Sequence, residues 1–126
     1  MRNAHISVTM NGETHSGMGK ASFTNEKAEL SYAFWGETEL VFTPAEAFLT
    51  RKGEMTFTLP LGKKSPTTVR LQTAYGEIPA TVTTTRYSAR VGETKAQITV
   101  EYLFSDGYQE QAFSFSLSVR ETTEEA

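Results

Sequence analysis

The chain has 126 residues, of which 38% are hydrophobic and 21% charged, so we expect one domain with a buried core. Its 12 Lys and Arg residues are outnumbered by 15 Asp and Glu residues, and the formal charge of −3 argues against a nucleic-acid binder. The absence of cysteine excludes disulfides, thiolate nucleophiles and cysteine-ligated zinc. No apolar stretch is long enough to span a membrane and the N-terminus does not read as a signal peptide, so we expect a cytoplasmic protein without a membrane partner.

Apolar and polar side chains alternate in short runs along most of the chain, and turn residues separate the runs. This period of two is typical of strands with one dry face and one wet face. In chain order, the predicted strands are residues 6–10, 21–24, 30–35, 39–42, 47–52, 55–59, 69–75, 78–87, 96–104 and 113–119. Asn11-Gly12 is a hairpin signal after the first strand, residues 16–19 are expected to be loose, and Pro44 ends the fourth strand.

A chain of about eight to ten such strands without a helix needs either a closed barrel or two packed sheets. We favour a closed antiparallel up-and-down barrel, because closure removes the edge strands. A two-sheet sandwich is the alternative. Residues 1–120 are predicted to form the single domain, and residues 121–126 an acidic, flexible tail.

The order of several segments resembles the YwiB-like family of small uncharacterised bacterial proteins. The segments are Leu30-Ser31-Tyr32, Glu39–Phe42, Leu49–Phe57 and Leu71–Ile78. The last is similar to the most characteristic segment of that family, in which a Thr-Pro-Tyr-Gly turn is expected; this chain has Ala74 in place of the proline. The resemblance covers roughly residues 28–119. It implies a streptavidin- or lipocalin-like barrel, and it implies no activity.

Strand phase selects candidate ligand-binding residues. If the apolar members of each run face inward, six polar residues in phase with them face inward near the barrel ends: Arg51, Thr73, Tyr75, Thr84, Arg86 and Tyr102. An apolar cavity with a few polar groups at its mouth is a common small-molecule site, and small barrels can hold one such ligand. Two arginines suit a carboxylate or phosphate group. The sequence therefore favours a binder of a small, partly apolar, anionic molecule.

Each candidate also has a structural interpretation. Arg51 and Arg86 can each cap a barrel end with the aliphatic stem of the side chain. Tyr102 can be a core residue, and Thr73–Gly76 can be a turn signature. A packed barrel serving as a structural or protein-interaction module, such as a homodimer joined through Trp35, is therefore the alternative function. Trp35 is out of phase with the inward residues of its strand and faces outward, unless a bulge beside Gly36 turns it inward.

Catalysis has little support in the sequence. His5 falls on the polar face of the first strand and His15 falls in a loop, and these are the only histidines. No nucleophile-and-base motif or metal-ligand spacing accompanies them. We therefore expect no enzyme, no catalytic or metal-binding residue and no cofactor.

Overall fold

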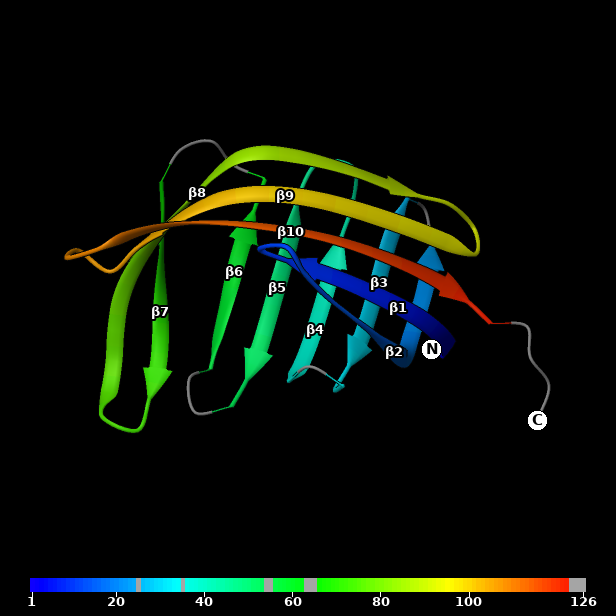
Figure 1. The fold of residues 1–126 in the computed structure, drawn as a ribbon, viewed down its shortest axis with the longest axis horizontal. Coiled ribbons are helices and arrows are strands. Elements are labelled where there is room, and N and C mark those ends of the chain that lie inside the picture. The colour runs from blue at the N-terminus through cyan, green and yellow to red at the C-terminus, as the bar shows by residue number, and fades with distance from the viewer. Residues whose placement is uncertain (25, 35, 54–55, 63–65, 123–126) are drawn as a thin grey trace.

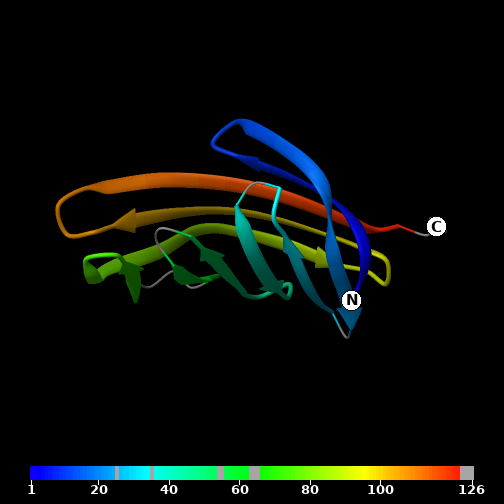
Figure 2. The ribbon, with the colours of Figure 1, turned by 90° about the horizontal axis from the view of Figure 1, so that it is seen from below.

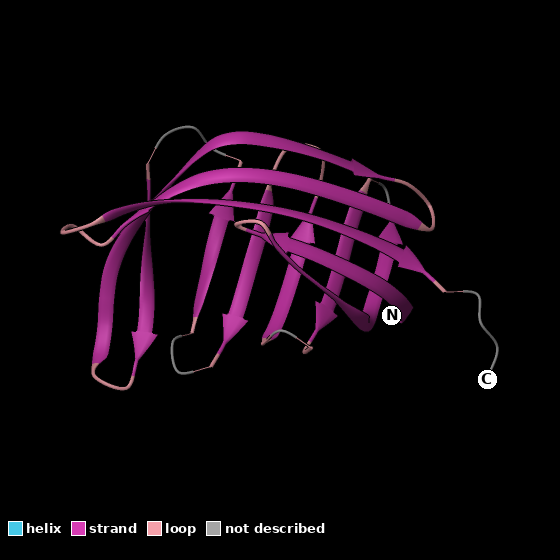
Figure 3. Ribbon diagram, viewed as in Figure 1, coloured by secondary structure: helices cyan, strands magenta, loops and turns pink. Residues whose placement is uncertain are grey.

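Ten antiparallel strands form one continuous sheet in the computed structural model, which describes residues 1–126 except 25, 35, 54–55, 63–65 and 123–126. The strands are β1 (Arg2–Met10), β2 (Glu13–Thr24), β3 (Lys27–Tyr32), β4 (Glu37–Phe42), β5 (Ala47–Lys52), β6 (Phe57–Leu61), β7 (Thr67–Thr73), β8 (Gly76–Val91), β9 (Lys95–Ser105) and β10 (Glu110–Glu121). The described residues contain no helix (Figure 3) and hence no helix that could cross a membrane.

The sheet runs in the order β6-β5-β4-β3-β2-β1-β10-β9-β8-β7 and curls into a nearly closed barrel. In Figure 1, β8, β9, β10 and β1 run across the picture, and β3 to β6 cross them steeply. Every pairing joins strands that are consecutive in the chain, except that β1 pairs with β10. The predicted up-and-down barrel is thus confirmed, and the single continuous sheet argues against two separate sheets.

The barrel is closed by few contacts between β6 and β7. Thr56 and Gln72 exchange two backbone hydrogen bonds of 2.9 Å just before β6 begins. At the other end of β6, the Gly62 amide donates to Thr84 Oγ1 at 2.9 Å. Pro60 lies within β6 and has no amide hydrogen to offer a neighbouring strand. We call this region, β6 together with β7, the seam.

The core follows from the alternation in the sequence. Every one of the ten strands contributes buried side chains, and the largest fully buried ones include Phe42, Ile6 and Leu30. Between these inward positions lie exposed or half-buried residues, as in β10, where Phe115, Leu117 and Val119 are buried and the serines between them are exposed. Burying large aliphatic and aromatic side chains stabilises the fold by about 1.5–3 kcal/mol each.

The first hairpin departs from the prediction at its second strand. Asn11 and Gly12 both have positive φ, 50° and 87°, as a two-residue hairpin turn requires, so that turn is confirmed. Residues 16–19 are not loose, because β2 begins at Glu13 and pairs with all of β1. Gly19 explains the difference: a Cβ built there would lie against Ser31 O and 2.6 Å from Ile6 Cδ1, so only glycine allows this close approach. The β1–β2 hairpin stands out beyond β10 in Figure 2.

The end of the chain is ordered further than the sequence suggests. The sequence predicts a tail from residue 121, yet Glu121 belongs to β10 and its amide donates to Thr94 O at 2.8 Å. The Thr122 amide donates to Asn3 O at 3.0 Å, which holds this segment beside the start of β1. The remainder of the predicted tail, residues 123–126, lies outside the described residues.

Candidate functional site

Three of the six predicted ligand-binding residues do face inward. Tyr102 is 5% exposed and stacks on Phe113 with ring centroids 5.4 Å apart. Thr84 is 3% exposed, and its hydroxyl accepts the hydrogen bond from Gly62. Arg51 is half-buried, and a Cβ built on Gly36 would lie 2.6 Å from its Nη2, so the guanidinium is packed against that glycine. Their proposed role in ligand binding remains a prediction.

The inward placement predicted for Arg86 is wrong. A bulge interrupts the β8–β9 pairing between Thr84 and Arg86, so that one extra residue, Thr85, shifts the phase of the rest of the strand. Beyond the bulge it is Tyr87, not Arg86, that packs against the core. The Arg86 side chain is 73% exposed, and its Nε lies 3.1 Å from Glu101 Oε2 on the outer face of the sheet.

The inward placement of Tyr75 is also wrong, because it occupies a hairpin tip. Tyr75 is 100% exposed between β7 and β8. Thr73, partly exposed at the start of this turn, donates through its hydroxyl to Gly76 O at 2.8 Å and accepts from the Tyr75 amide at 3.1 Å. These bonds are those of a side-chain-stabilised turn. The structure therefore agrees with the turn interpretation of Thr73–Gly76.

Arg51 lies near two buried tyrosines at a barrel end filled with rings. Burial raises the pKa of Tyr102 to about 12, and the charge of Arg51 opposes that rise. Burial also raises the pKa of Tyr32, against a hydrogen bond with Thr38 and the same Arg51 charge. Tyr32 in turn stacks on Phe34, with ring centroids 4.8 Å apart. This arrangement agrees with the capping interpretation of Arg51, because its charge lies near the buried tyrosines at this end of the barrel.

The two histidines lie on different faces of the first hairpin. His15 belongs to β2 and not to a loop, and its Nε2 lies 3.2 Å from Glu13 Oε1 on the same strand. His5 is exposed on β1, as its phase predicts. Among the described residues, no group of three or more His, Asp and Glu side chains could hold a metal ion. Trp35, the predicted partner surface, lies outside the described residues.

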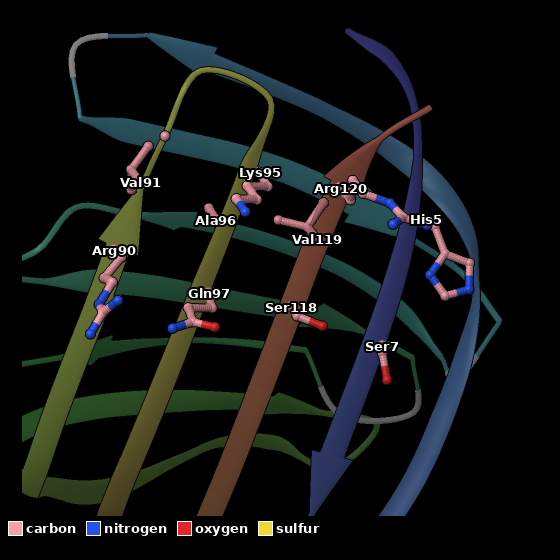
Figure 4. A pocket seen from close by; sticks show the side chains of 11 residues that line it. His5, Ser7, Arg90, Val91, Lys95, Ala96, Gln97, Ser118, Val119 and Arg120 are labelled. Carbon is pink, nitrogen blue, oxygen red and sulfur yellow. The ribbon is translucent and has the colours of Figure 1, made fainter. Parts of the chain in front are cut away.

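A pocket of about 700 Å³ lies on the outer face of β8, β9, β10 and β1, near the β8–β9 turn (Figure 4). Strand register arranges its polar side chains in two rows. Lys95 pairs with Arg120, which pairs with His5, and these three form the first row. The second row, one step further along the strands, runs from Arg90 through Gln97 and Ser118 to Ser7. We call this site the outer-face pocket.

The first row places like charges side by side. Lys95 on β9 and Arg120 on β10 are directly opposite one another on neighbouring strands. Like charges in this arrangement destabilise the sheet when nothing balances them. Arg90 is the diagonal neighbour of Lys95 on the same face. None of the described residues that line the pocket is an Asp or a Glu. Within the described chain, no ion pair is recorded for these three cations, whereas Glu121, next to Arg120, is 2.9 Å from Arg2.

Such a cluster can hold an anion. Guanidinium and ammonium groups bind carboxylate and phosphate oxygens through charge-assisted hydrogen bonds, and each adjacent cation adds to the field. The side chains of Arg90, Lys95 and Arg120 are exposed and so reachable by a ligand. Figure 4 shows the four residues of the second row in a line across the strands, with the Arg120 side chain reaching toward β1.

The sequence does not predict this pocket, because the candidate ligand-binding residues follow from the inward phase of the strands and the polar side chains of the pocket belong to the outward phase. The phase of His5 was sufficient to place it on a wet face, but nothing in the sequence states that β1 pairs with β10. Without that pairing, Arg120 and His5 are 115 positions apart and have no relation to one another. The three cations also lie just outside the strands predicted from the alternation, 78–87, 96–104 and 113–119, so the sequence carries no signal that they share a face.

A second, smaller pocket of about 340 Å³ lies beside the β8 bulge. Ala45 and Gly62 line it together with residues 84–87, so it contains two of the six predicted ligand residues, Thr84 and Arg86. Both are already engaged, Thr84 by the Gly62 amide and Arg86 by Glu101. A cation that is already paired offers less to an anion than the uncompensated cluster of the outer-face pocket.

Comparison with known proteins gives a family and a fold. A family model described as Domain of unknown function (DUF1934) matches residues 3–118. A solved structure, "Crystal structure of ywiB protein from Bacillus subtilis", is similar with a TM-score of 0.71 and 17% sequence identity, over 96% of this chain and 91% of that chain. No curated protein matches. At this identity the likeness to the solved structure shows the fold alone.

Proposed function

Given that the chain belongs to the DUF1934 family, whose description assigns no function, we propose that it is a non-catalytic binding protein for an anionic ligand held in the outer-face pocket. The family membership and the ywiB fold confirm the resemblance seen in the sequence. They leave the function to be argued from the site itself, since a fold alone does not imply an activity.

One observation carries the proposal: Lys95, Arg120 and Arg90 cluster in the outer-face pocket, and the part of the chain that the structure describes places no carboxylate in its lining. The chain as a whole is acidic, with a formal charge of −3, so a local cationic cluster is not a consequence of composition. A bound anion would offset the repulsion between the directly opposed Lys95 and Arg120.

The proposed ligand is anionic, as expected from the sequence, but its site lies on the outer surface of the barrel and not in the interior. Side chains from all ten strands occupy the interior, and the Arg51 end is filled by stacked rings. Arg86, the second expected anchor, is exposed and paired with Glu101. We therefore propose that the ligand is bound outside the barrel, and that any likeness to lipocalins is limited to the shape of the barrel.

The proposal is tested with inorganic pyrophosphate as the probe, followed by amide NMR shifts at low ionic strength. We expect saturable shifts at Gln97 and Ser118, and at least tenfold weaker binding in Lys95→Gln/Arg120→Gln. Added salt should weaken binding, because exposed charges are screened. Both substitutions are on exposed side chains, so the fold should tolerate them.

The matched control is Arg70→Gln/Arg86→Gln, which removes the same amount of charge outside the pocket. Arg70 and Arg86 are each paired with a carboxylate, at 3.1 Å from Glu77 and Glu101. This control should retain the affinity of the wild type within about threefold, the margin left for long-range screening. Equal losses in the two double variants would show a general charge effect and contradict a specific site.

The remaining expectations from the sequence accompany this proposal. We propose that the protein acts in the cytoplasm, that it has no catalytic activity and no cofactor, and that nucleic acids and membranes are not its partners. The composition supports this: there is no cysteine and no basic excess. A homodimer through Trp35 stays a prediction, which the concentration dependence of the mass in sedimentation would test.

A further inference from the structure

The two rows of the outer-face pocket differ in the charge of their side chains. The first row consists of Lys95, Arg120 and His5, whereas the second carries one cation, Arg90, at its edge and neutral side chains at Gln97, Ser118 and Ser7. Rows on the same face are two residues apart along each strand, which is about 6.6–6.8 Å. The pocket therefore has a cationic end and a neutral end, which are separated by about the width of a small molecule. The side chains at the neutral end can donate and accept hydrogen bonds.

The neutral side chains of the second row have hydrogen-bonding groups that a ligand can use. No side-chain hydrogen bond is recorded between Gln97, Ser118 or Ser7 and any other described residue. In the next row along, by contrast, Thr99 and Ser116 are 3.3 Å apart, oxygen to oxygen, and satisfy one another. An amide and two hydroxyls that are not used within the chain are suited to the hydroxyl groups of a ligand.

The chemistry of the lining argues against two other classes of anionic ligand, nucleotides and fatty acids. None of the described residues that line the pocket is Phe, Tyr or Trp, so it lacks the broad rings on which nucleobases usually stack, and the imidazole of His5 is the one ring among these residues. The apolar members, Val91, Ala96 and Val119, belong to the inward phase of their strands and offer no broad surface for an acyl chain. What remains is an anionic group attached to a compact, hydroxyl-rich body.

We propose that the outer-face pocket binds a phosphorylated sugar or polyol, with the phosphate on Lys95 and Arg120 and the hydroxyls on Gln97, Ser118 and Ser7. This inference rests on the proposed function and specifies its ligand class. The same cationic row could also bind free phosphate, so the test separates the contribution of the phosphate from that of the hydroxyl-bearing body.

The experiment measures the affinities of the intact protein for glucose 6-phosphate, inorganic phosphate and glucose by amide NMR titration. We expect glucose 6-phosphate to bind at least tenfold more tightly than inorganic phosphate, and glucose to give no saturable shift. Gln97→Ala/Ser118→Ala should abolish this preference and leave the affinity for inorganic phosphate unchanged. The control, Thr99→Ala/Ser116→Ala, removes two hydroxyls one row away and should keep the preference.

The outcomes separate this inference from the proposed function. Equal affinity for glucose 6-phosphate and inorganic phosphate, both lost in Lys95→Gln/Arg120→Gln, would overturn the sugar phosphate and leave the anion site intact. Failure of both phosphates and of pyrophosphate to bind would overturn both proposals. Tighter binding of adenosine monophosphate or of a short oligothymidylate than of glucose 6-phosphate would also overturn the inference, since it would show recognition of a base or of a nucleic-acid backbone.

Discussion

Tyr102 makes the stability of the barrel sensitive to alkali. Burial raises the pKa of its hydroxyl to about 12, against about 10 for tyrosine in an unfolded chain. Because the folded protein holds this proton more tightly, the stabilisation is fully present below pH 10 and is lost as the pH rises from 10 to 12. The free energy of unfolding that is lost over this range is about 3 kcal/mol.

We therefore predict that Tyr102→Phe flattens the decline of the urea midpoint between pH 10 and pH 12. The phenyl ring keeps the stacking on Phe113 and removes the ionisable group. Burial also raises the pKa values of Tyr32 and Tyr87, so part of the decline should persist in the variant. A decline identical to that of the wild type would show that Tyr102 does not control the alkaline limit.

Gly19 is the residue at which the first hairpin depends on the absence of a side chain. We predict that Gly19→Ala destabilises the protein by about 1–3 kcal/mol, as measured by urea denaturation, because the new methyl group meets backbone as well as side-chain atoms. The Ser31 carbonyl belongs to the neighbouring strand and cannot rotate away as the end of the Ile6 side chain can.

Gly53→Ala is the matched control for this substitution. A Cβ built at Gly53 meets no atom of the described residues within 4 Å, and the φ of Gly53 is not in the left-handed region. This variant should be as stable as the wild type or more stable by up to about 1 kcal/mol, since alanine restricts the unfolded chain. A loss of stability equal to that of Gly19→Ala would mean that crowding at Ser31 is not the cause.

At the scale of elements, the seam is the weakest part of the barrel. Each of β6 and β7 has a full strand partner on one side and, on the other, is linked mainly through Thr56 and Gln72. We predict that peptides covering β6 and β7 exchange their amide hydrogens at least tenfold faster than those covering β9 and β10, which have partners on both sides. Hydrogen exchange followed by mass spectrometry measures this, and uniform protection around the barrel would contradict it.

The strands are predictable from the sequence because burial on one face imposes a period of two. In β8, however, the period of two does not hold along the whole strand. Val82 and Thr84 obey the alternation, and the single extra residue at Thr85 reverses it for everything after. Nothing in the run Thr83-Thr84-Thr85 distinguishes a bulge from a regular strand. The sequence phase therefore predicts the wrong face for Arg86 for a local, physical reason, and the same bulge puts Tyr87 against the core.

The candidate site was less predictable than the fold, because it depends on which strands are neighbours. Periodicity tells which face a side chain is on, and it placed His5 correctly. It does not tell which wet faces adjoin, and the row Lys95–Arg120–His5 exists only through the β9–β10 and β10–β1 pairings. Sequence phase could therefore assign Tyr102 to the interior, whereas the outer-face pocket required the topology.

At the scale of the whole molecule, the strand order allows the chain to be reconnected. Thr122 and Asn3 are already joined by a backbone hydrogen bond of 3.0 Å, and β6 and β7 share few contacts. A circular permutant that links these two residues and opens the chain between β6 and β7 would run β7-β8-β9-β10-β1-β2-β3-β4-β5-β6, so that every pairing joins consecutive strands. We predict that this permutant folds to the same barrel.

Its folding should also be faster than that of the natural chain, because the one distant pairing has become local and folding rates fall as contacting residues become more separated in sequence. Stopped-flow refolding measures the difference, and the amide NMR spectrum checks that the fold is retained. A permutant that folds no faster would show that the β1–β10 pairing is not formed in the rate-limiting step.

The pairing of β1 with β10 also determines the order in which strands can pair during synthesis. About 100 residues separate Met10, at the end of β1, from Glu110, at the start of β10. At about 5–20 residues per second, the ribosome needs about 5–20 s to make this length of chain. Throughout that time β1 can pair only with β2, and its other edge presents unpaired backbone beside Ile6 and Val8. The nascent chain is thus exposed to association with other chains until its final strand has emerged, and a chaperone acting on it would have to protect that edge.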